Sequence, residues 1–287
     1  MKRELLDRAV AEAAARRRAI LVAIVEVAGS TPRERGAAML VAASGAIAGT
    51  IGGGSAEHRS IAIARRMLDD PAPAPQVEAF ALNPVLDQCC GGRMTVAFAP
   101  LDADDAPRLA AAGDALELWA GGPAIPIEPP PRPAFVFGGG HVGAALVSVL
   151  APLPFRVRWI DARLDGFLGP APAGVASVAT PLPEAEIRNA PAGAFHLVMT
   201  HSHALDLEIV AAGMEEGRFG FLGLIGSATK RALFARRLAE RGIDADRIAR
   251  LACPIGIPGI PGKEPAVIAA STAAQLLLAD AALRGVG

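Results

Sequence analysis

The stretch of residues 134–150, AFVFGGGHVGAALVSVL, decides the fold of the C-terminal half of the chain. Residues 134–137 form an apolar run of strand length, and residues 141–150 carry apolar side chains at helical spacing. The pattern G-x-G-x-x-G runs from the end of this strand into the helix and contains Gly138, Gly140 and Gly143. A strand, a glycine-rich turn and a helix in this order are typical of a phosphate-binding βαβ unit.

Each glycine of this turn has its own physical reason. The first permits a tight turn, the second lets a pyrophosphate approach the backbone, and the third allows close packing of helix on strand. Asp161 follows the last glycine by 18 residues, after the predicted strand 155–160, where it would accept hydrogen bonds from ribose hydroxyls. His141 would lie near the ligand. We therefore predict a Rossmann-type unit; the alternative is a tight turn that binds no nucleotide.

Strand and helix signals alternate through the rest of this half. Strands are predicted at residues 195–199 and 219–224, and helices at residues 204–214 and 228–241. This order predicts an α/β fold with a parallel sheet and helices on both faces. A last, strongly apolar helix over residues 264–283 is expected to pack on the sheet or on a second subunit.

Four prolines within residues 129–133 mark a domain boundary. Such a run cannot continue a helix or a central strand, and it forms a stiff, extended spacer. We predict an N-terminal domain over residues 1–128, a linker over residues 129–133 and a Rossmann-like domain over residues 134–287.

The N-terminal part mixes helix and strand signals and is expected to be a smaller α+β domain. The predicted helices cover residues 5–17 and 55–68, the second with Ser55 as its N-cap. The predicted strands cover residues 20–27, 37–42, 47–51, 77–82 and 94–98.

Composition excludes several classes of protein. With 287 residues, 52% hydrophobic and 20% charged, the chain can bury a sizeable core, so it is not a wholly disordered protein. Its net charge of −1 argues against a general nucleic-acid binder. We expect neither a membrane span nor a signal peptide, because charged residues interrupt the apolar runs. Three cysteines, two of them adjacent, indicate a reducing compartment, so a cytoplasmic location is expected.

The adjacent cysteines, Cys89 and Cys90, precede Gly91 in the segment 88–93, QCCGGR. An arginine in a flexible loop beside the two thiols favours the thiolate form. Thiolates bind soft metals and can carry or deliver sulfur. The alternative is two buried cysteines that act as small hydrophobic residues.

Two further glycine loops are suited to an anion through their backbone N–H groups. Residues 29–36, GSTPRERG, follow a predicted strand, and residues 49–55, GTIGGGS, precede a predicted helix. The second loop contains three successive glycines: Gly52, Gly53 and Gly54. Glu57 lies in the first turn of that helix, where a carboxylate interacts well with the helix dipole, so a structural role is expected for it. The alternative is a pair of ordinary turns.

Residues 200–206, THSHALD, follow a predicted strand at its carboxyl end, where α/β sheets place their ligands. They supply four polar candidates: Thr200, His201, His203 and Asp206. A polar rim for an anion is favoured over a zinc site, whose third ligand would have to be Cys90 or Asp206.

A similar helix start lies further along the chain, with backbone amides and a cation: Gly226, Ser227 and Lys230. Residues 253–264, CPIGIPGIPGKE, are rich in glycine and proline and are typical of a shaped binding loop.

These segments together resemble one family, the xanthine dehydrogenase accessory proteins of the XdhC and CoxI type. The resemblance runs in order along nearly the whole chain through GSTPR (29–33), GTIGGG (49–54), QCCGG (88–92), FGGGHVG (137–143), THSHALD (200–206), GLIGS (223–227) with Lys230, and CPIG (253–256) through KEP (263–265).

The resemblance implies a chaperone-like protein without turnover, and hence no catalytic residue. Such proteins bind the molybdenum cofactor (molybdopterin), support its sulfuration by a cysteine desulfurase and insert it into xanthine dehydrogenase or a related molybdenum hydroxylase. The residues carried over as cofactor-binding are Gly52, Gly53, Gly54, Glu57, Cys89, Cys90, Gly91, Gly138, Gly140, His141, Gly143, Asp161, Thr200, His201, His203, Asp206, Gly226, Ser227 and Lys230. Cys90 is the candidate ligand of the bound molybdenum, and the apolar last helix makes a homodimer plausible.

Two other classes stay open from the residues alone. An NAD(P)-dependent oxidoreductase would use the glycine turn and Asp161, with His201 or Lys230 for acid–base work, because a chain without tyrosine has no Tyr–Lys relay. A thiol- or metal-handling protein would use the two adjacent cysteines together with His201 and His203.

Overall fold

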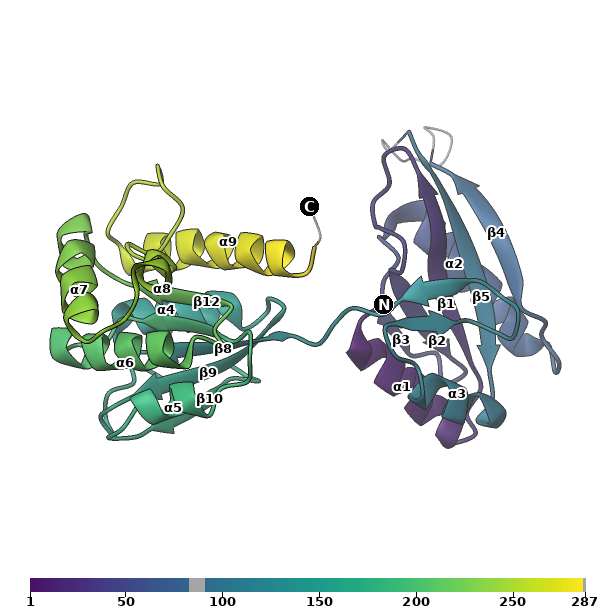
Figure 1. Ribbon diagram of the computed structural model, residues 1–287. Coiled ribbons are helices and arrows are strands. Elements are labelled where there is room, and N and C mark those ends of the chain that lie inside the picture. The colour runs from purple at the N-terminus through teal and green to yellow at the C-terminus, as the bar shows by residue number, and fades with distance from the viewer. Residues whose placement is uncertain (83–90, 286–287) are drawn as a thin grey trace. The chain divides into compact units, whose positions relative to one another are not determined.

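The computed structural model describes residues 1–82 and 91–285, so Cys89 and Cys90 lie outside the described residues. The chain divides into two compact units, Met1–Pro130 and Pro131–Gly287 (Figure 1). Each unit has its own sheet and its own core, so the two are described separately.

The C-terminal unit is built on a six-stranded parallel sheet in the order β10-β9-β8-β11-β12-β13. Its strands are β8 (Arg132–Phe137), β9 (Phe155–Asp161), β10 (Ala176–Ala179), β11 (Phe195–Val198), β12 (Phe221–Leu224) and β13 (Leu251–Ala252). Counted from β8, this is the order 3-2-1-4-5-6 of the dinucleotide-binding doubly wound fold. The order reverses between β8 and β11, which are hydrogen-bonded neighbours. The predicted fold class is confirmed.

Helices cover both faces of this sheet (Figure 1). They are α4 (His141–Leu150), α5 (Glu184–Arg188), α6 (His203–Glu216), α7 (Ala228–Glu240), α8 (Ala245–Ala249) and α9 (Pro265–Leu283). One core cluster joins α4 and α9 to the sheet, and a second joins α5, α6 and α7 to the opposite face. Alternate residues of β8 supply each core: Val136 points to the first and Phe137 to the second.

By length and composition alone, α9 is apolar enough to cross a membrane, the one such helix among residues 1–82 and 91–285. Its residues Ala269, Ala273 and Leu276 are nevertheless buried in the core cluster that it shares with α4. Asp280 near its C-terminal end is also buried and accepts a hydrogen bond from Arg132 Nε at 2.7 Å. One side of α9 thus packs within the unit, whereas Leu277 and Leu278 are exposed.

Strand β8 begins inside the predicted linker, which was expected to end at Pro133. The N–H of Arg132 donates to the carbonyl of Pro154 at 3.0 Å. Pro133 stands opposite Arg156 of β9, whereas pairing with β11 begins one residue later. A proline at the start of a strand is tolerated because no neighbour on that side needs its missing N–H.

The N-terminal unit holds a five-stranded antiparallel sheet in the order β3-β2-β1-β5-β4, which agrees with the predicted α+β class. Its strands are β1 (Ala19–Ala28), β2 (Ala38–Ala42), β3 (Ile47–Gly49), β4 (Gln76–Ala81) and β5 (Arg93–Leu101). Helix α2 (Gly54–Asp69) covers one face, and α1 (Arg3–Ala14), α3 (Ala106–Ala110) and the hairpin of β6 (Ala115–Glu117) and β7 (Ala124–Pro126) cover part of the other. The last three elements were not predicted, because each spans only 3–5 residues.

Helix α2 begins one residue earlier than predicted, and its N-cap is Gly53 instead of Ser55. Gly53 has a φ of +74°, a conformation that glycine adopts without steric cost. The three glycines therefore let the chain turn directly from β3 into the helix, which leaves Ser55 inside the first turn.

Candidate functional site

The glycine turn after β8 uses its three glycines in three different ways. A Cβ atom on Gly138, whose φ is +129°, would lie 2.3 Å from the carbonyl oxygen of Met199. A Cβ atom on Gly143 would lie 1.9 Å from the carbonyl oxygen of Gly138. A Cβ atom on Gly140 would meet nothing within 4 Å. The first and third glycines thus permit close packing within the unit, and the second borders open space at the N-terminus of α4.

Asp161 lies beside this turn, where the sequence predicted it, but its carboxylate is buried and bonded to its own chain. Oδ2 accepts the N–H of Gly139 at 2.7 Å, and Oδ1 accepts the N–H of Arg163 at 2.9 Å and its Nε at 3.0 Å. Burial acts to raise the pKa of Asp161, but the bonds from Arg163 and Gly139 outweigh it, so this pKa is lowered. The Asp161 carboxylate, which we expected to bind a ribose, is therefore hydrogen-bonded to the glycine turn and to Arg163.

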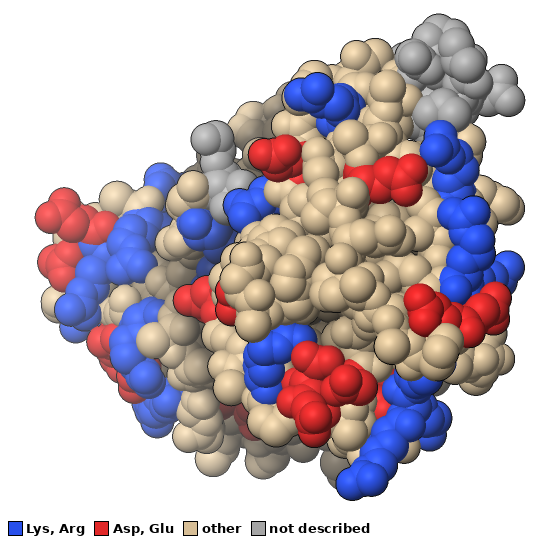
Figure 2. Space-filling view, turned by 90° about the vertical axis from the view of Figure 1, so that its right-hand side faces the viewer, with Lys and Arg blue, Asp and Glu red and all other residues tan. Residues whose placement is uncertain are grey.

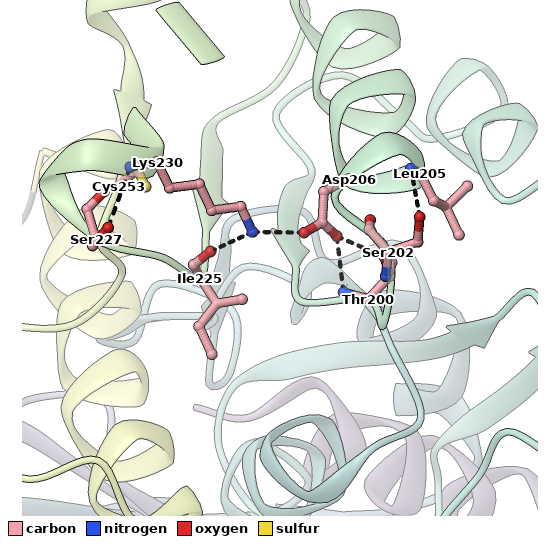
Figure 3. Close-up of polar contacts among 8 residues, drawn as sticks. All are labelled: Thr200, Ser202, Leu205, Asp206, Ile225, Ser227, Lys230 and Cys253. Carbon is pink, nitrogen blue, oxygen red and sulfur yellow. Dashed lines mark hydrogen bonds and ion pairs between the residues drawn. The ribbon is translucent and has the colours of Figure 1, made fainter. Parts of the chain in front are cut away.

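The loops after β11 and β12 are joined by a buried ion pair (Figure 3). Asp206, fully buried in α6, accepts the N–H of Thr200 at 2.9 Å and its hydroxyl at 2.7 Å. Its other oxygen accepts Lys230 Nζ at 2.7 Å, and Lys230 also donates to the carbonyl of Ile225 at 2.9 Å. Three of the predicted ligand-binding side chains thus bind one another.

The serines of these loops cap helices. Ser202 Oγ accepts the N–H of Leu205 at the start of α6, and Ser227 Oγ accepts the N–H of Lys230 at the start of α7 (Figure 3). The helix starts of α4, α6 and α7 all follow strands of the parallel sheet, so they lie at its carboxyl edge. Three histidines at these starts are exposed: His141, His201 and His203. Within the described ranges, no group of three or more His, Cys, Asp or Glu side chains is placed to hold a metal ion.

The glycine- and proline-rich loop after β13 is held by α9. The N–H of Gly256 donates to Gln275 Oε1 at 2.8 Å, and the N–H of Ile257 donates to Ser271 Oγ at 2.7 Å. Cys253, at the start of the loop, is buried, and burial raises the pKa of its thiol. The sequence analysis did not predict that Ser271 and Gln275 hold this loop. Their signal in the sequence is that they are polar residues within an apolar helix.

In the N-terminal unit, the glycine loop before α2 is filled by a carboxylate of its own helix. One oxygen of Glu57, Oε2, accepts the hydroxyl of Thr50, the N–H of Ile51 at 2.9 Å and the N–H of Gly53 at 3.2 Å. Burial acts to raise the pKa of Glu57, but these hydrogen bonds lower it overall. This geometry agrees with the structural role expected for Glu57. The hydroxyl and the two N–H groups that the loop donates are bonded to this carboxylate.

Three motif loops of this unit lie against one another. A Cβ atom on Gly92 would lie 2.2 Å from the carbonyl oxygen of Ser30, so the backbones at Ser30 and Gly92 are in direct contact. On the other side, a Cβ atom on Gly52 would lie 3.0 Å from the ring of Pro32. A Cβ atom on Gly91 would meet no described residue within 4 Å. The described residues of these motifs thus meet at one end of the sheet.

A cavity of about 300 Å³ lies in the same unit, between α1 and the strands β2 and β3. Its charged lining residues are of both signs: Lys2, Arg8, Arg33, Glu4 and Glu128. The face in Figure 2 likewise shows both acidic and basic groups, with a run of basic groups along its right-hand edge. This distribution agrees with the near-zero net charge.

Two family models match the chain. The XdhC Rossmann domain matches residues 135–276, and the XdhC and CoxI family matches residues 12–80. The match in both units defines the class of protein, an XdhC-type two-domain chain. The protein belongs to the XdhC and CoxI family.

A curated protein and a solved structure are also similar to this chain. The uncharacterised protein YqeB of Escherichia coli (strain K12) is 30% identical over 261 residues, which are 88% of this chain and 42% of that protein. The chain thus spans less than half the length of that relative. A crystal structure described as a xanthine dehydrogenase from Bacillus halodurans is 20% identical, covers 96% of both chains and has a TM-score of 0.74, which shows a shared fold.

Proposed function

We propose that this protein is an accessory factor for xanthine dehydrogenase or a related molybdenum hydroxylase, and that it binds the molybdenum cofactor and inserts it into that enzyme. Membership of the XdhC family supports the accessory role in maturation. A cysteine desulfurase that sulfurates the bound cofactor, a homodimeric state and a cytoplasmic location belong to the same proposal.

The single observation that carries the proposal is the open space at Gly140 beside side chains that are already paired. The first N–H groups of α4 have no acceptor within the helix, and they favour an anion there. Nearby, Asp161, Asp206 and Lys230 are bonded to their own chain. This arrangement supports binding of a phosphorylated ligand at Gly140.

The phosphate of molybdopterin fits these residues. Gly140 and the N-terminus of α4 would hold the phosphate, and the exposed His141, His201 and His203 would offer polar contacts at the rim. When bound, the cofactor supplies the dithiolene-held molybdenum that the recipient enzyme needs. Cys89 and Cys90, outside the described residues, keep their predicted role as temporary ligand or sulfur relay as part of the proposal.

The test compares two substitutions at Gly140 in protein purified from cells that make the cofactor. Gly140→Asp introduces a favourable N-cap residue but places a carboxylate where the phosphate would bind, and Gly140→Asn is its uncharged match. Pterin is measured by fluorescence after oxidation, and molybdenum by elemental analysis. We expect near-stoichiometric pterin in the parent chain and at least about tenfold less in Gly140→Asp than in Gly140→Asn, because two anions repel at close range.

The result that contradicts the proposal is a parent chain that holds no pterin, even after incubation with free cofactor. Tight binding of NAD or NADP together with hydride transfer would then favour the oxidoreductase. Equal amounts of pterin in Gly140→Asp and Gly140→Asn would mean that the cofactor does not bind at the turn after β8. A role for the thiols is tested by Cys89→Ser and Cys90→Ser, with the buried Cys253→Ser as control.

A further inference from the structure

After β9 the chain folds back over the glycine turn. The N–H of Leu168 donates to the carbonyl of Gly139 at 2.9 Å. A Cβ atom on Gly139 would lie 2.2 Å from the carbonyl oxygen of Gly166, so the two backbones are in direct contact. Phe167 packs edge-on against Trp159, with 4.8 Å between the ring centroids. We name residues 162–168 the covering segment.

The covering segment lies where a dinucleotide-binding βαβ unit places a ribose. In such units the acid at the end of the second strand binds ribose hydroxyls beside the glycine turn. Here Asp161 Oδ2 is 2.7 Å from the N–H of Gly139, a direct hydrogen bond that leaves no room for a sugar between them. The remaining oxygen of Asp161 is bonded to Arg163 of the covering segment.

We propose that the covering segment is a specificity element that takes the place of the nucleotide ribose, so that the glycine turn rejects adenine dinucleotides. Gly140 stays open, so a phosphorylated ligand that does not extend across Asp161 still has access. This inference rests on the proposed function only in taking Gly140 as the ligand-facing residue.

Gly166 is the residue that allows the covering segment to lie so close. A Cβ atom there would be 2.1 Å from Asp161 Oδ1 and 2.4 Å from its carboxyl carbon. Any side chain at this position therefore pushes the segment away from Asp161. Leu164, two residues earlier, is 91% exposed and provides the matched control.

The experiment uses the full chain and three variants: Gly166→Ala, Gly166→Val and Leu164→Ala. Calorimetric titration with NAD and with ADP-ribose measures nucleotide binding, and amide hydrogen exchange at Leu168 measures whether the segment is in place. For the parent chain and Leu164→Ala we expect a protected Leu168 amide and no saturation by either nucleotide up to about 1 mM. For the Gly166 variants we expect faster exchange at Leu168 and an affinity for ADP-ribose at least about tenfold higher.

Two results overturn the inference. One is that the parent chain binds NAD with a dissociation constant well below about 1 mM and that Asp161→Asn abolishes this binding. The carboxylate would then be available to a ribose. The other is a Gly166 variant whose Leu168 amide exchanges freely while ADP-ribose still fails to bind, since the segment would then not be what excludes it. Neither result depends on the pterin content of the purified chain, so failure of the proposed function is seen separately.

Discussion

The two units of this protein each place a glycine-rich loop before a helix, and the two loops differ in what fills them. The loop before α2 is occupied by Glu57, whose Oε2 accepts two backbone N–H groups and the hydroxyl of Thr50. The first turn of α4 contains no acidic residue, and Gly140 at its start borders open space.

The difference teaches that a glycine loop can offer its backbone N–H groups to a ligand only where the chain leaves them unused. Both loops fit an anion by sequence, because each is followed by a helix N-terminus. In the N-terminal unit a carboxylate in the first turn already satisfies that preference. In the C-terminal unit Asp161 takes the N–H of Gly139 but does not reach Gly140. The following predictions alter one loop or the other.

The largest effect is expected from Gly143→Val. The new Cβ would overlap the carbonyl oxygen of Gly138, so the free energy of unfolding of the C-terminal unit should fall by about 4 kcal/mol or more. Urea unfolding followed by Trp159 fluorescence in a Trp119→Phe background measures this unit alone. The control is Gly140→Ala, which adds a methyl group to open space and should cost at most about 1 kcal/mol. Equal losses in both would mean that the turn is not packed as described.

Removing Lys230 should have the next largest effect. Lys230→Met leaves the buried Asp206 carboxylate without its cation, which should cost about 3–5 kcal/mol in the same unfolding measurement. The exposed neighbour Arg231→Met is the control and should change stability by less than about 0.5 kcal/mol. Adding Asp206→Asn to Lys230→Met should recover part of the lost free energy of unfolding. If the double variant instead loses the sum of the two single losses, Lys230 and Asp206 do not interact directly.

Removing the carboxylate from the glycine loop before α2 should lower the free energy of unfolding by less than either change above. Glu57→Ala removes the acceptor of two backbone N–H groups, so the N-terminal unit should lose about 1–3 kcal/mol at pH 7. Because the pKa of folded Glu57 is lowered, its stabilisation is present above the ordinary value of 4.5 and is lost as the pH falls through the lowered value. Urea unfolding in steps from pH 7 to pH 3 measures both effects.

The control for Glu57 is Asp69→Asn at the far end of the same helix, an exposed position. It should leave the stability at pH 7 and its acid dependence nearly unchanged. If Glu57→Gln and the parent chain lose stability equally between pH 4.5 and pH 3, the charge of Glu57 does not stabilise the loop.

The smallest effect on stability is expected from His141→Glu, which gives α4 the acid in its first turn that α2 already has. Because a carboxylate is favourable at a helix N-terminus, the free energy of unfolding should rise by about 0.3–1 kcal/mol. The same charge should lower the amount of pterin retained by purified protein. His141→Gln is the neutral match, and equal retention in the two variants would show that the N-terminus of α4 does not hold an anion.

Much of the C-terminal unit was predictable because its strands are short apolar runs separated by glycine turns. The predicted helix over residues 141–150 coincides with α4, and the predicted strand that ends at Asp161 is β9. The edge strand β10 was missed because three of its four residues are exposed and carry no apolar pattern. Helix α5 was missed because it has only five residues.

The candidate site was less predictable than the fold. Periodicity located Asp161, Asp206 and Lys230 at the ends of strands or the starts of helices, but it does not show which polar groups pair. Lys230 meets Asp206 across 24 residues, and Gly139 meets Asp161 across 22. Such pairs form only when parallel strands bring their carboxyl ends together.

By itself, the sequence determined the α/β class, the helix that follows the glycine turn and the membership of the XdhC family, because these depend on local patterns of apolar residues, glycines and short motifs. Only the tertiary structure decided which of the predicted ligands are available. Glu57, Asp161, Asp206 and Lys230 bind their own chain, whereas Gly140 borders open space and the three histidines are exposed. The physical reason is that a buried charge must find a partner within the fold, and that partner comes from wherever the chain returns to meet it.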